Sequence, residues 1–342
     1  MTQRPISTPR FNTMAAKAAV PDSSSCKVVM AGAVAKGLLA EVQESLSKFS
    51  GKPKLVGFLA NEDPAAQMYA DWSAKTAKEN GVDFDLRRVD KEEIETAILA
   101  ANEDKTVNGI IVYYPIFPAP SRQDQYIQQL VDIHKDVEGL SHRYVFNLYQ
   151  NIRFFSETAD STKQFKSILP CTPLAVVKIL EYLHIYNTVL AYGNRLHGRT
   201  ITVINRSEVV GRPLAALLAN DGATVYSVDI TGVQLFTRGR GLKSPRHQVH
   251  EKEGWTVTDC LPLSDVVISG VPGDKYKVPT ELIRDGAVCI NFSSEKNFVA
   301  TEVKEKASIY VPAIGKVTIA ILLRNLMRGT VVSALLGLEF KD

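Results

Sequence analysis

Residues 200–213 read TITVINRSEVVGRP, and this stretch decides the fold. An apolar run at 200–204 leads through a polar turn to Gly211 and then to a proline that suits the first position of a helix. We therefore predict a strand, a loop and a helix in direct succession. The N-terminus of such a helix has free backbone N–H groups and a partial positive charge, so it can hold a pyrophosphate. Because the loop lacks the G-x-G-x-x-G spacing, an ordinary strand-to-helix connection stays open as the alternative.

The same alternation extends outward in both directions. Downstream, β-rich runs follow a helical pattern at 213–220, and they lie at 223–228, 265–269 and 287–291. Upstream, β-rich runs at 54–59, 82–89 and 109–113 alternate with helical patterns at 64–80 and 92–101. Helical patterns also cover 174–183 and 317–326, and Asp63 is a candidate cap for the helix that starts at Pro64. We predict an α/β protein with two α/β domains, the second a Rossmann-type doubly wound parallel sheet.

The composition limits the class of protein. The chain has 342 residues, enough for about two domains, and a formal net charge of +3. This near balance of charge predicts neither nucleic acid nor a membrane surface as a partner. No stretch approaches the ~18 consecutive apolar residues of a membrane helix. The four cysteines form no C-x-x-C pair, which favours a reducing compartment and gives no motif for a metal.

The N-terminal segment allows two interpretations. Residues 1–21 are basic and rich in hydroxyl side chains, and the first acid is Asp22, as in a mitochondrial transit peptide. Prolines at positions 5, 9 and 21 would interrupt the amphipathic helix of such a peptide. We therefore expect a disordered tail over 1–26 and a cytoplasmic protein, with a mitochondrial location as the alternative.

A second basic stretch, 237–259, shows little periodicity and includes Arg238, Arg246 and His247. A basic patch that binds phosphate is one interpretation of such a stretch. We favour a solvated loop.

Position 229 bears on the choice of cofactor. Asp229 stands at the end of the next predicted strand, 18 residues after Gly211, where a carboxylate would meet the ribose hydroxyls of an adenosine. A 2′-phosphate about 4 Å away would cost about 4 kcal/mol at an effective dielectric of 20, which favours NAD over NADP. Arg206 argues the other way, because a guanidinium can pair with a 2′-phosphate. A turn or cap residue is the structural alternative for Asp229.

Several short motifs follow one another in a fixed order. Residues 205–213 fit the pattern G-R-S-x-x-V-G-x-P at every fixed position except the first, which is Asn205. The other motifs are KDVEG at 135–139, PCTP at 170–173, GVP at 270–272, a tyrosine at 69 and the segment 312–318. Together they resemble the methylenetetrahydrofolate dehydrogenase family over about residues 27–330.

The resemblance implies a division of labour between the two domains. A folate-binding catalytic domain would occupy 27–160 and be completed by a C-terminal helix at 316–342. A NAD-binding Rossmann domain would occupy 161–315, and a cleft between the domains would bring folate and NAD together. The resemblance also implies a homodimer.

Two departures from the family pattern concern the hydrolytic step. Bifunctional members carry Tyr-x-x-x-Lys on a helix, so that both side chains face one cleft. Here Tyr69 is present but Ser73 replaces the lysine, and Lys75 lies about 240° around the helix from Tyr69. The partner glutamine of the family aligns with Tyr113. With Asp229, this pattern resembles the monofunctional NAD-dependent members, and the glycine-rich segment of the family is altered here at 312–318.

The reaction implied by the resemblance is oxidation of 5,10-methylenetetrahydrofolate to 5,10-methenyltetrahydrofolate, with hydride transfer to NAD. Because the leaving species is a hydride, no side-chain base is needed. The folate residues carried over are Tyr69, Tyr113, Asp136 and Glu138, with Tyr69, Glu138 and Cys171 as catalytic candidates. Glu138 takes the position of the pterin-contacting acid, and Asp136 is expected to have a structural role. Cys171 either traps an iminium as a thiolate or simply packs.

The NAD site expected from the motifs lies in the loops after the strands of the second domain, and no metal is predicted. It comprises Asn205, Arg206, Ser207, Gly211, Asp229, Gly270, Val271, Asn291, Phe292, Ser293 and Ser294. Two other functions stay open: a bifunctional NADP-dependent dehydrogenase-cyclohydrolase, and a protein that binds NAD without catalysis.

Overall fold

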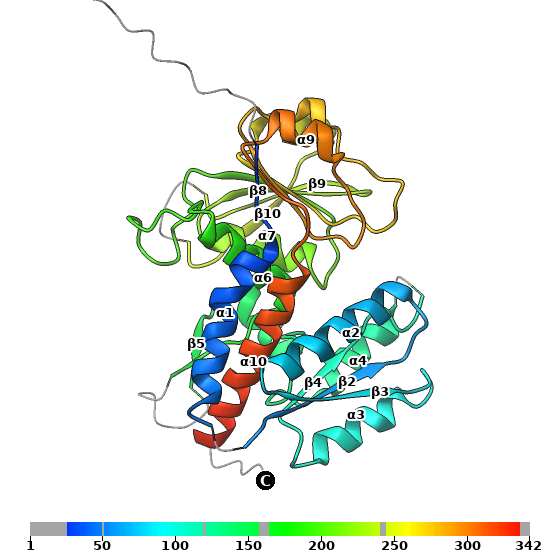
Figure 1. Ribbon diagram of the computed structural model, residues 1–342. Coiled ribbons are helices and arrows are strands. Elements are labelled where there is room, and N and C mark those ends of the chain that lie inside the picture. The colour runs from blue at the N-terminus through cyan, green and yellow to red at the C-terminus, as the bar shows by residue number, and fades with distance from the viewer. Residues whose placement is uncertain (1–25, 50, 119–120, 157–163, 240–243, 336–342) are drawn as a thin grey trace, which may run out of the picture.

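The computed structural model describes residues 26–49, 51–118, 121–156, 164–239 and 244–335. The predicted N-terminal tail lies outside these residues except for Cys26, as does 336–342 at the end of the predicted C-terminal helix. Within the described residues, the chain forms two parallel-dominated sheets joined by a layer of helices (Figure 1).

The larger sheet has eight strands and confirms the predicted Rossmann-type domain. Its order is β1 (Lys27–Val28), β13 (Ile309–Val311), β12 (Val288–Asn291), β11 (Val266–Ser269), β7 (Thr200–Ile204), β8 (Thr224–Asp229), β9 (Gly232–Thr237) and β10 (Gln248–Glu251). In this spatial order, the first six strands, from β1 through β13, β12, β11 and β7 to β8, run parallel to one another. β9 is antiparallel to β8, and β10 is antiparallel to β9. The central strands β11 and β12 are buried along their whole length, as expected for a sheet covered on both faces.

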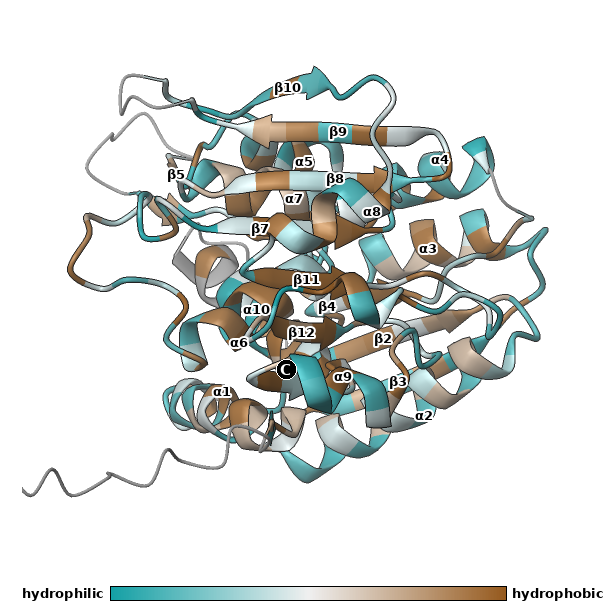
Figure 2. Cartoon of the chain, turned by 90° about the horizontal axis from the view of Figure 1, so that it is seen from above, coloured by the Kyte–Doolittle hydropathy of each residue, from teal (hydrophilic) through white to brown (hydrophobic). Residues whose placement is uncertain are grey.

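The prediction of a solvated loop over 237–259 is wrong in part, because the segment contains a strand of the antiparallel edge and a short helix. Residues 248–251 form β10, which pairs with β9, and Val257–Cys260 form the short helix α8. β10 is exposed throughout and mostly hydrophilic, with Val249 as its single apolar residue, so it lacks the alternating apolar pattern by which a strand is recognised (Figure 2). Arg238 binds the carbonyls of Gly193, Asn220 and Ser244 and therefore anchors loops, while residues 240–243 lie outside the described part.

The smaller sheet has the order β3 (Asp83–Arg88), β2 (Lys54–Leu59) and β4 (Gly109–Val112), all parallel. Helices α2 (Pro64–Glu79), α3 (Ile94–Glu103) and α4 (Arg122–Leu130) belong to this half (Figure 1). The predicted cap is confirmed, since the Asp63 carboxylate accepts the Ala65 N–H at 2.9 Å and Pro64 opens the helix.

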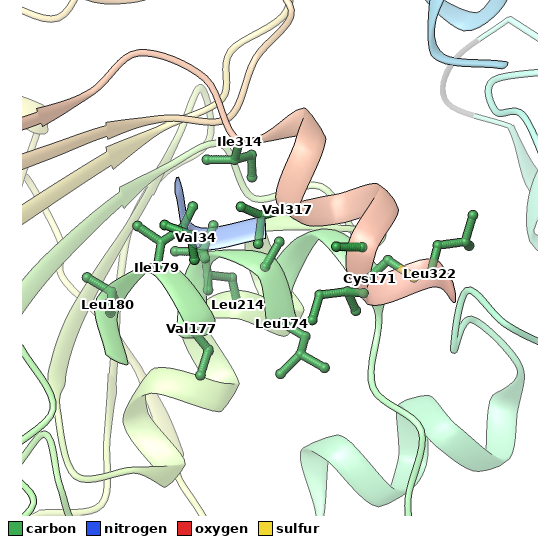
Figure 3. Close-up of a cluster of buried hydrophobic side chains, with 14 of the residues drawn as sticks. Val34, Cys171, Leu174, Val177, Ile179, Leu180, Leu214, Ile314, Val317 and Leu322 are labelled. Carbon is green, nitrogen blue, oxygen red and sulfur yellow. The ribbon is translucent and has the colours of Figure 1, made fainter. Parts of the chain in front are cut away.

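Three helices form the layer between the two sheets. They are α1 (Ala31–Leu46), α6 (Cys171–Tyr182) and α10 (Gly315–Leu335). α10 packs against α1 and α6 and also contacts α2 and β4, while α6 packs against α7 (Gly211–Asn220) under the larger sheet. Figure 3 shows the apolar side chains of α6 meeting Val34, Leu214 and Val317 in this layer. One continuous core therefore joins both halves of the molecule.

Some element limits differ from those expected. α6 begins at Cys171 rather than 174, and α10 extends nine residues beyond the helical pattern at 317–326, within the C-terminal helix that the resemblance implies at 316–342. Residues 27 and 28, which the sequence placed in the first domain, pair with β13 of the larger sheet; the other domain limits stay predictions. The remaining elements are α5 (His142–Tyr149), β5 (Phe154–Phe155), β6 (Phe165–Lys166), α9 (Ala300–Lys306) and two short 3-10 turns, Leu261–Leu263 and Thr280–Leu282.

Among the residues that the structure describes, no helix is long and apolar enough to cross a bilayer. No group of three or more His, Cys, Asp or Glu side chains is arranged there as a metal site, and the four cysteines are free thiols.

Candidate active site

The predicted dinucleotide residues gather at one edge of the larger sheet. β7, β8, β11 and β12 are parallel, so their carboxyl ends meet at the same edge. The chain passes from β7 through α7 to β8 on one side, whereas β11 lies on the other side of β7. The strand order therefore reverses between β7 and β11, which is where open α/β sheets bind ligands.

Asn205 fixes the turn at this point. Its φ is +112°, its amide nitrogen donates to the Gly270 carbonyl at 2.8 Å, and its amide oxygen accepts the Ser207 N–H at 2.7 Å. The side chain thereby ties the loop after β7 to the loop after β11. A Cβ on Gly211 would lie 1.8 Å from the Asn205 carbonyl oxygen, so only glycine permits this close approach.

The carboxylate of Asp229 also organises the loop. One oxygen accepts the Arg206 N–H at 2.7 Å and the other accepts the Ile230 N–H at 2.8 Å. The Arg206 guanidinium turns away to Thr231 Oγ1 at 2.6 Å and to the carbonyls of Ser227 and Gly232, both at 3.3 Å. The structural role considered for Asp229 is thus present, and its charge has no basic side chain paired with it in the described residues.

The loops after β11 and β12 depend on two buried asparagines. Asn291 donates to the carbonyls of Ser293 and Glu295, and Ser293 Oγ donates to the Val271 carbonyl at 2.9 Å. Asn297 is fully buried; its amide oxygen accepts the Val271 N–H at 2.8 Å and its amide nitrogen donates to the Val271 carbonyl. Asn297 was not predicted from the sequence, where its only signal is a polar residue directly before the apolar Phe298.

Aromatic packing sets the spacing of these loops. A Cβ on Gly270 would come within 1.9 Å of the Phe292 ring, so the ring lies directly over this glycine. Ser207 and Ser294 are exposed at the same edge. The edge thus offers a glycine turn leading into a helix of ten residues and a carboxylate at the end of β8, which fits a dinucleotide with unphosphorylated ribose.

The predicted folate residues gather on the smaller sheet and its helix α2. The rings of Tyr69 and Tyr113 lie edge to face with centroids 5.7 Å apart. Tyr69 is half-buried and Tyr113 is buried. Burial, with smaller contributions from Cys171, Tyr113 and Glu138, raises the pKa of Tyr69 well above its usual value. These four side chains are therefore close neighbours.

Ser73 and Tyr113, the two departures from the family pattern, lie beside each other. Ser73 is buried and donates to the Tyr69 carbonyl at 2.8 Å. Burial raises the pKa of the Tyr113 phenol, and Ser73 lies close enough to oppose that shift. Gly57 makes room for the ring, because a Cβ there would lie 3.2 Å from Tyr113 and 2.8 Å from Phe84. Lys75 is exposed beside Glu79 at 3.9 Å, so it does not substitute for the missing lysine.

Glu138 is a half-buried carboxyl group next to the main chain of β4. Its Oε2 accepts the Val112 N–H at 2.9 Å. Burial raises the pKa of Glu138 to about 8, the Val112 hydrogen bond opposes that shift, and Asp136 adds to it. The group can therefore change its charge within the range of pH in which enzymes are assayed.

Asp136 is buried and holds the loop that presents Glu138. Its carboxylate accepts the N–H groups of Glu138, Gly139 and Ser141 at 3.1, 2.8 and 2.8 Å. Gly139 has φ +73°, and a Cβ there would lie 2.7 Å from the Leu169 carbonyl carbon. The structural role expected for Asp136 is thus what its hydrogen bonds support.

Cys171 begins α6 and is buried. Its Sγ donates to the Val137 carbonyl at 3.2 Å, and the Asn325 amide nitrogen lies 3.6 Å from it. Burial, followed by the nearby Glu138 and Asp136, raises the pKa of the Cys171 thiol well above its usual value. A neutral, hydrogen-bonded thiol is a poor nucleophile, so this geometry favours the packing role over the trap for an iminium.

Asn325 on α10 joins these loops, and its role was not predicted from the sequence. The side chain is buried and donates to the carbonyls of Val137 and Leu169 at 3.0 and 3.2 Å. Its signal was a single amide within the apolar pattern of the last helix.

Comparison with known proteins identifies the same two parts of the chain. Residues 29–138 match the catalytic domain of the tetrahydrofolate dehydrogenase/cyclohydrolase family, and residues 170–238 match its NAD(P)-binding domain.

Individual relatives cover most of the chain. A methylenetetrahydrofolate dehydrogenase [NAD(+)] of Schizosaccharomyces pombe is 59% identical over 90% of this chain and 93% of its own length. The enzyme of the same name from Saccharomyces cerevisiae is 54% identical over 88% of this chain and 95% of its own length. The solved structure of the NAD-dependent 5,10-methylenetetrahydrofolate dehydrogenase from Saccharomyces cerevisiae superposes with a TM-score of 0.85, at 52% identity, over 91% of this chain and 99% of that one.

Proposed function

The chain belongs to the tetrahydrofolate dehydrogenase/cyclohydrolase family, and we propose that it oxidises 5,10-methylenetetrahydrofolate with NAD without performing the hydrolytic step that follows. The observation that carries the proposal is the identity of 59% and 54% to two NAD-dependent enzymes over nearly the whole chain. The geometry agrees, because the residues that replace the hydrolytic pair are buried together beside Tyr69.

The chemistry requires alignment rather than proton removal. A hydride leaves the methylene carbon between N5 and N10 of the folate, and the two nitrogens share the positive charge that remains. When bound, the nicotinamide ring supplies the hydride acceptor. Tyr69 and Glu138 bind and orient the pterin, and no side-chain base takes part. The contribution of the chain is to hold the two rings in register and to exclude water.

The preference for NAD follows from the end of β8. The Arg206 guanidinium is taken up by Thr231 and neighbouring carbonyls, so it is not presented to a 2′-phosphate. Asp229 accepts two backbone N–H groups and has no basic side chain paired with it among the described residues, and this carboxylate stands where the adenosine ribose would lie. A phosphate there would meet like charge, whereas two ribose hydroxyls would find an acceptor.

The absence of hydrolysis follows from the chemistry at Ser73 and Tyr113. A lysine four residues after Tyr69 would present an ammonium beside the folate, and Ser73 instead bonds its own helix. Tyr113 fills the adjoining space with a ring and leaves no amide to position water.

The test is a pair of assays on the purified full-length protein. Reduction of NAD by 5,10-methylenetetrahydrofolate should exceed reduction of NADP by at least tenfold in kcat/KM. Hydrolysis of 5,10-methenyltetrahydrofolate should not exceed the spontaneous rate. Equal rates with both cofactors would contradict the NAD assignment, hydrolysis above background would favour a bifunctional enzyme, and NAD binding without turnover would favour a non-catalytic protein.

We also propose a homodimer and a cytoplasmic location. Resemblance to the family supports the first, and the prolines near the N-terminus support the second. Sedimentation of the purified protein and imaging of the tagged full chain test them.

A further inference from the structure

A cavity of about 390 Å³ lies apart from the candidate active site. It is bounded by α5, α6, α10, the hairpin β5–β6 and the loop that joins α6 to β7. An adjoining hollow of about 260 Å³ lies between α1 and α10 and shares Lys166, Arg324 and Arg328 with the cavity. None of the residues that we assign to folate or NAD lines either space.

Positive charge on the walls exceeds the negative charge available to balance it. The basic side chains around the cavity are Arg153, Lys166, Lys178, Arg195, Arg324 and Arg328.

Each acid around the two spaces already has a basic partner. Asp221 binds Arg153 at 2.6 Å and also accepts the Tyr186 hydroxyl at 3.0 Å. Glu181 pairs with Lys178 at 2.6 Å, and Glu41 pairs with Arg324 at 2.7 Å. Lys166, Arg195 and Arg328 have no carboxylate within ion-pair distance in the residues that the structure describes.

The unbalanced cations repel one another. Partial burial, and then Arg328, Lys178 and Arg324, lower the pKa of Lys166 to about 8. Burial and then Arg324 lower the pKa of Arg328 to about 10. An anion placed among these groups would relieve both effects, because it would supply the charge that the walls lack.

The other walls suit an organic molecule. Leu148, Leu169, Leu174 and Val177 line the cavity. Figure 3 shows Leu174 and Val177 pointing to the same side of α6, away from Val317. The Nε of Arg195, which also lines the cavity, is buried and has no hydrogen-bond partner among the residues that the structure describes. A site with an apolar wall, a cationic end and an unsatisfied donor is of the kind that holds small anionic ligands.

We propose that this cavity binds a small organic anion with at least two negative charges, whose phosphate or carboxylate groups lie among Lys166, Arg324 and Arg328 and whose body lies against the leucines. The bound anion would join β6 to α6 and α10, and so add a brace between the hairpin and the central helix layer.

Calorimetric titration of the full-length protein tests the proposal. Pyrophosphate and citrate serve as probes of the two anion chemistries, and saturating NAD is present so that neither binds at the dinucleotide loop. We expect saturable binding of at least one probe, and the tighter of the two shows whether the site prefers phosphate or carboxylate. The double variant Lys166→Gln/Arg328→Gln should weaken that binding at least tenfold, because two charge-assisted contacts are lost. Lys75→Gln, which removes an exposed lysine on α2, is the matched control and should leave it unchanged.

A charge reversal keeps the test informative should the double variant fail to fold. Lys166→Glu places a carboxylate opposite Arg324 and Arg328, so it should abolish probe binding and raise the Tm of the ligand-free protein. Three results would overturn the proposal: no saturable binding of either probe, undiminished binding in the variants, or a change of oligomeric mass in Lys166→Glu, which would show that a second copy of the chain covers the site.

Discussion

At the end of β8, one carboxylate serves both the loop and the proposed cofactor. Asp229 accepts the N–H groups of Arg206 and Ile230, and so it shapes the turn that follows β7 as well as the ribose site. A substitution that removes the whole carboxylate therefore mixes a structural effect with an electrostatic one.

Two substitutions separate these effects. Asp229→Asn keeps an oxygen acceptor but removes the charge, and Asp229→Ser shortens the side chain as well. We expect Asp229→Asn to lower the ratio of kcat/KM for NAD to that for NADP at least tenfold, because the repulsion of a 2′-phosphate is lost. Asp229→Ser should lower the ratio similarly and also reduce activity with NAD. Steady-state kinetics with both cofactors measure this, and an unchanged ratio in Asp229→Asn would remove the charge from the explanation.

Glu138 predicts a pH dependence of folate binding. Its pKa of about 8 means that the carboxyl is mostly protonated at pH 7 in the substrate-free protein. An ionised carboxylate accepts hydrogen bonds from the pterin more strongly than the protonated acid does, so the KM for the folate should fall as the pH rises from 7 to 9, by up to about tenfold. Initial rates over this range measure the change. Glu138→Gln should flatten the profile, and an equally steep profile in that variant would assign the titration to another group.

The raised pKa of Glu138 also predicts the direction in which the stability of the folded protein changes with pH. Because the pKa of Glu138 is raised on folding, the folded protein holds this proton more tightly than the unfolded chain does. Its contribution to stability is complete below the unfolded pKa of about 4.5 and is lost as the pH rises through about 8. The Tm of Glu138→Gln should therefore change less between pH 5 and pH 9 than that of the parent protein.

Among the elements, α10 joins the loop that carries Glu138 to the segment before α6 in the folate-binding half. Asn325 on this helix donates to carbonyls on both sides of the gap between the Glu138 loop and the start of α6. Removing it leaves the Leu169 carbonyl without this donor and the Val137 carbonyl with only the weak Cys171 thiol donor, and a buried group left unsatisfied costs roughly 1–3 kcal/mol.

We expect Asn325→Ala to lower the free energy of unfolding by about 2–4 kcal/mol, as measured by urea denaturation. Asn325→Leu is the matched variant, since it fills the volume but supplies no donor, and it should be destabilised to a similar extent. Full stability in Asn325→Leu would show that packing, not hydrogen bonding, holds this junction.

The elements also show where prediction from sequence succeeds and fails. β7 and the start of α7 were predictable because apolar residues, a glycine and a proline occur in the order that the backbone requires. β10 was not, since an exposed edge strand needs no apolar side chains. The role of Asn205 in joining two loops was also hidden, because it depends on a contact with Gly270, 65 residues away. Motif residues could thus be placed on loops, but their partners could not.

On the scale of the whole molecule, the core is shared between the two halves. One apolar cluster extends from Leu55 and Ile111 of the smaller sheet, through Leu322 of α10, to Ile201 and Val266 of the larger sheet. Two domains were predictable from the alternation of elements, but this continuity was not, since it depends on how α1, α6 and α10 pack.

Continuity of the core predicts cooperative unfolding. We expect the full chain to unfold by heat in a single transition, because neither half can expose the helix layer without exposing apolar surface of the other. Differential scanning calorimetry checks this, because the ratio of the calorimetric to the van't Hoff enthalpy of unfolding should be close to one when the whole chain unfolds as a single unit. Two resolved transitions, or a saturating NAD concentration that shifts only part of the heat absorption, would show independent domains.

The position of α10 has a consequence for synthesis on the ribosome. Translation proceeds from the N-terminus, and the helix that completes the first half is encoded at the far end of the chain, at 315–335. The smaller sheet, β3-β2-β4, therefore leaves the ribosome long before the helix that covers it has been synthesised. Its apolar face stays exposed to solvent while the larger domain is translated. Nascent chains stalled before residue 315 should bind general chaperones, and release should follow once α10 has left the exit tunnel.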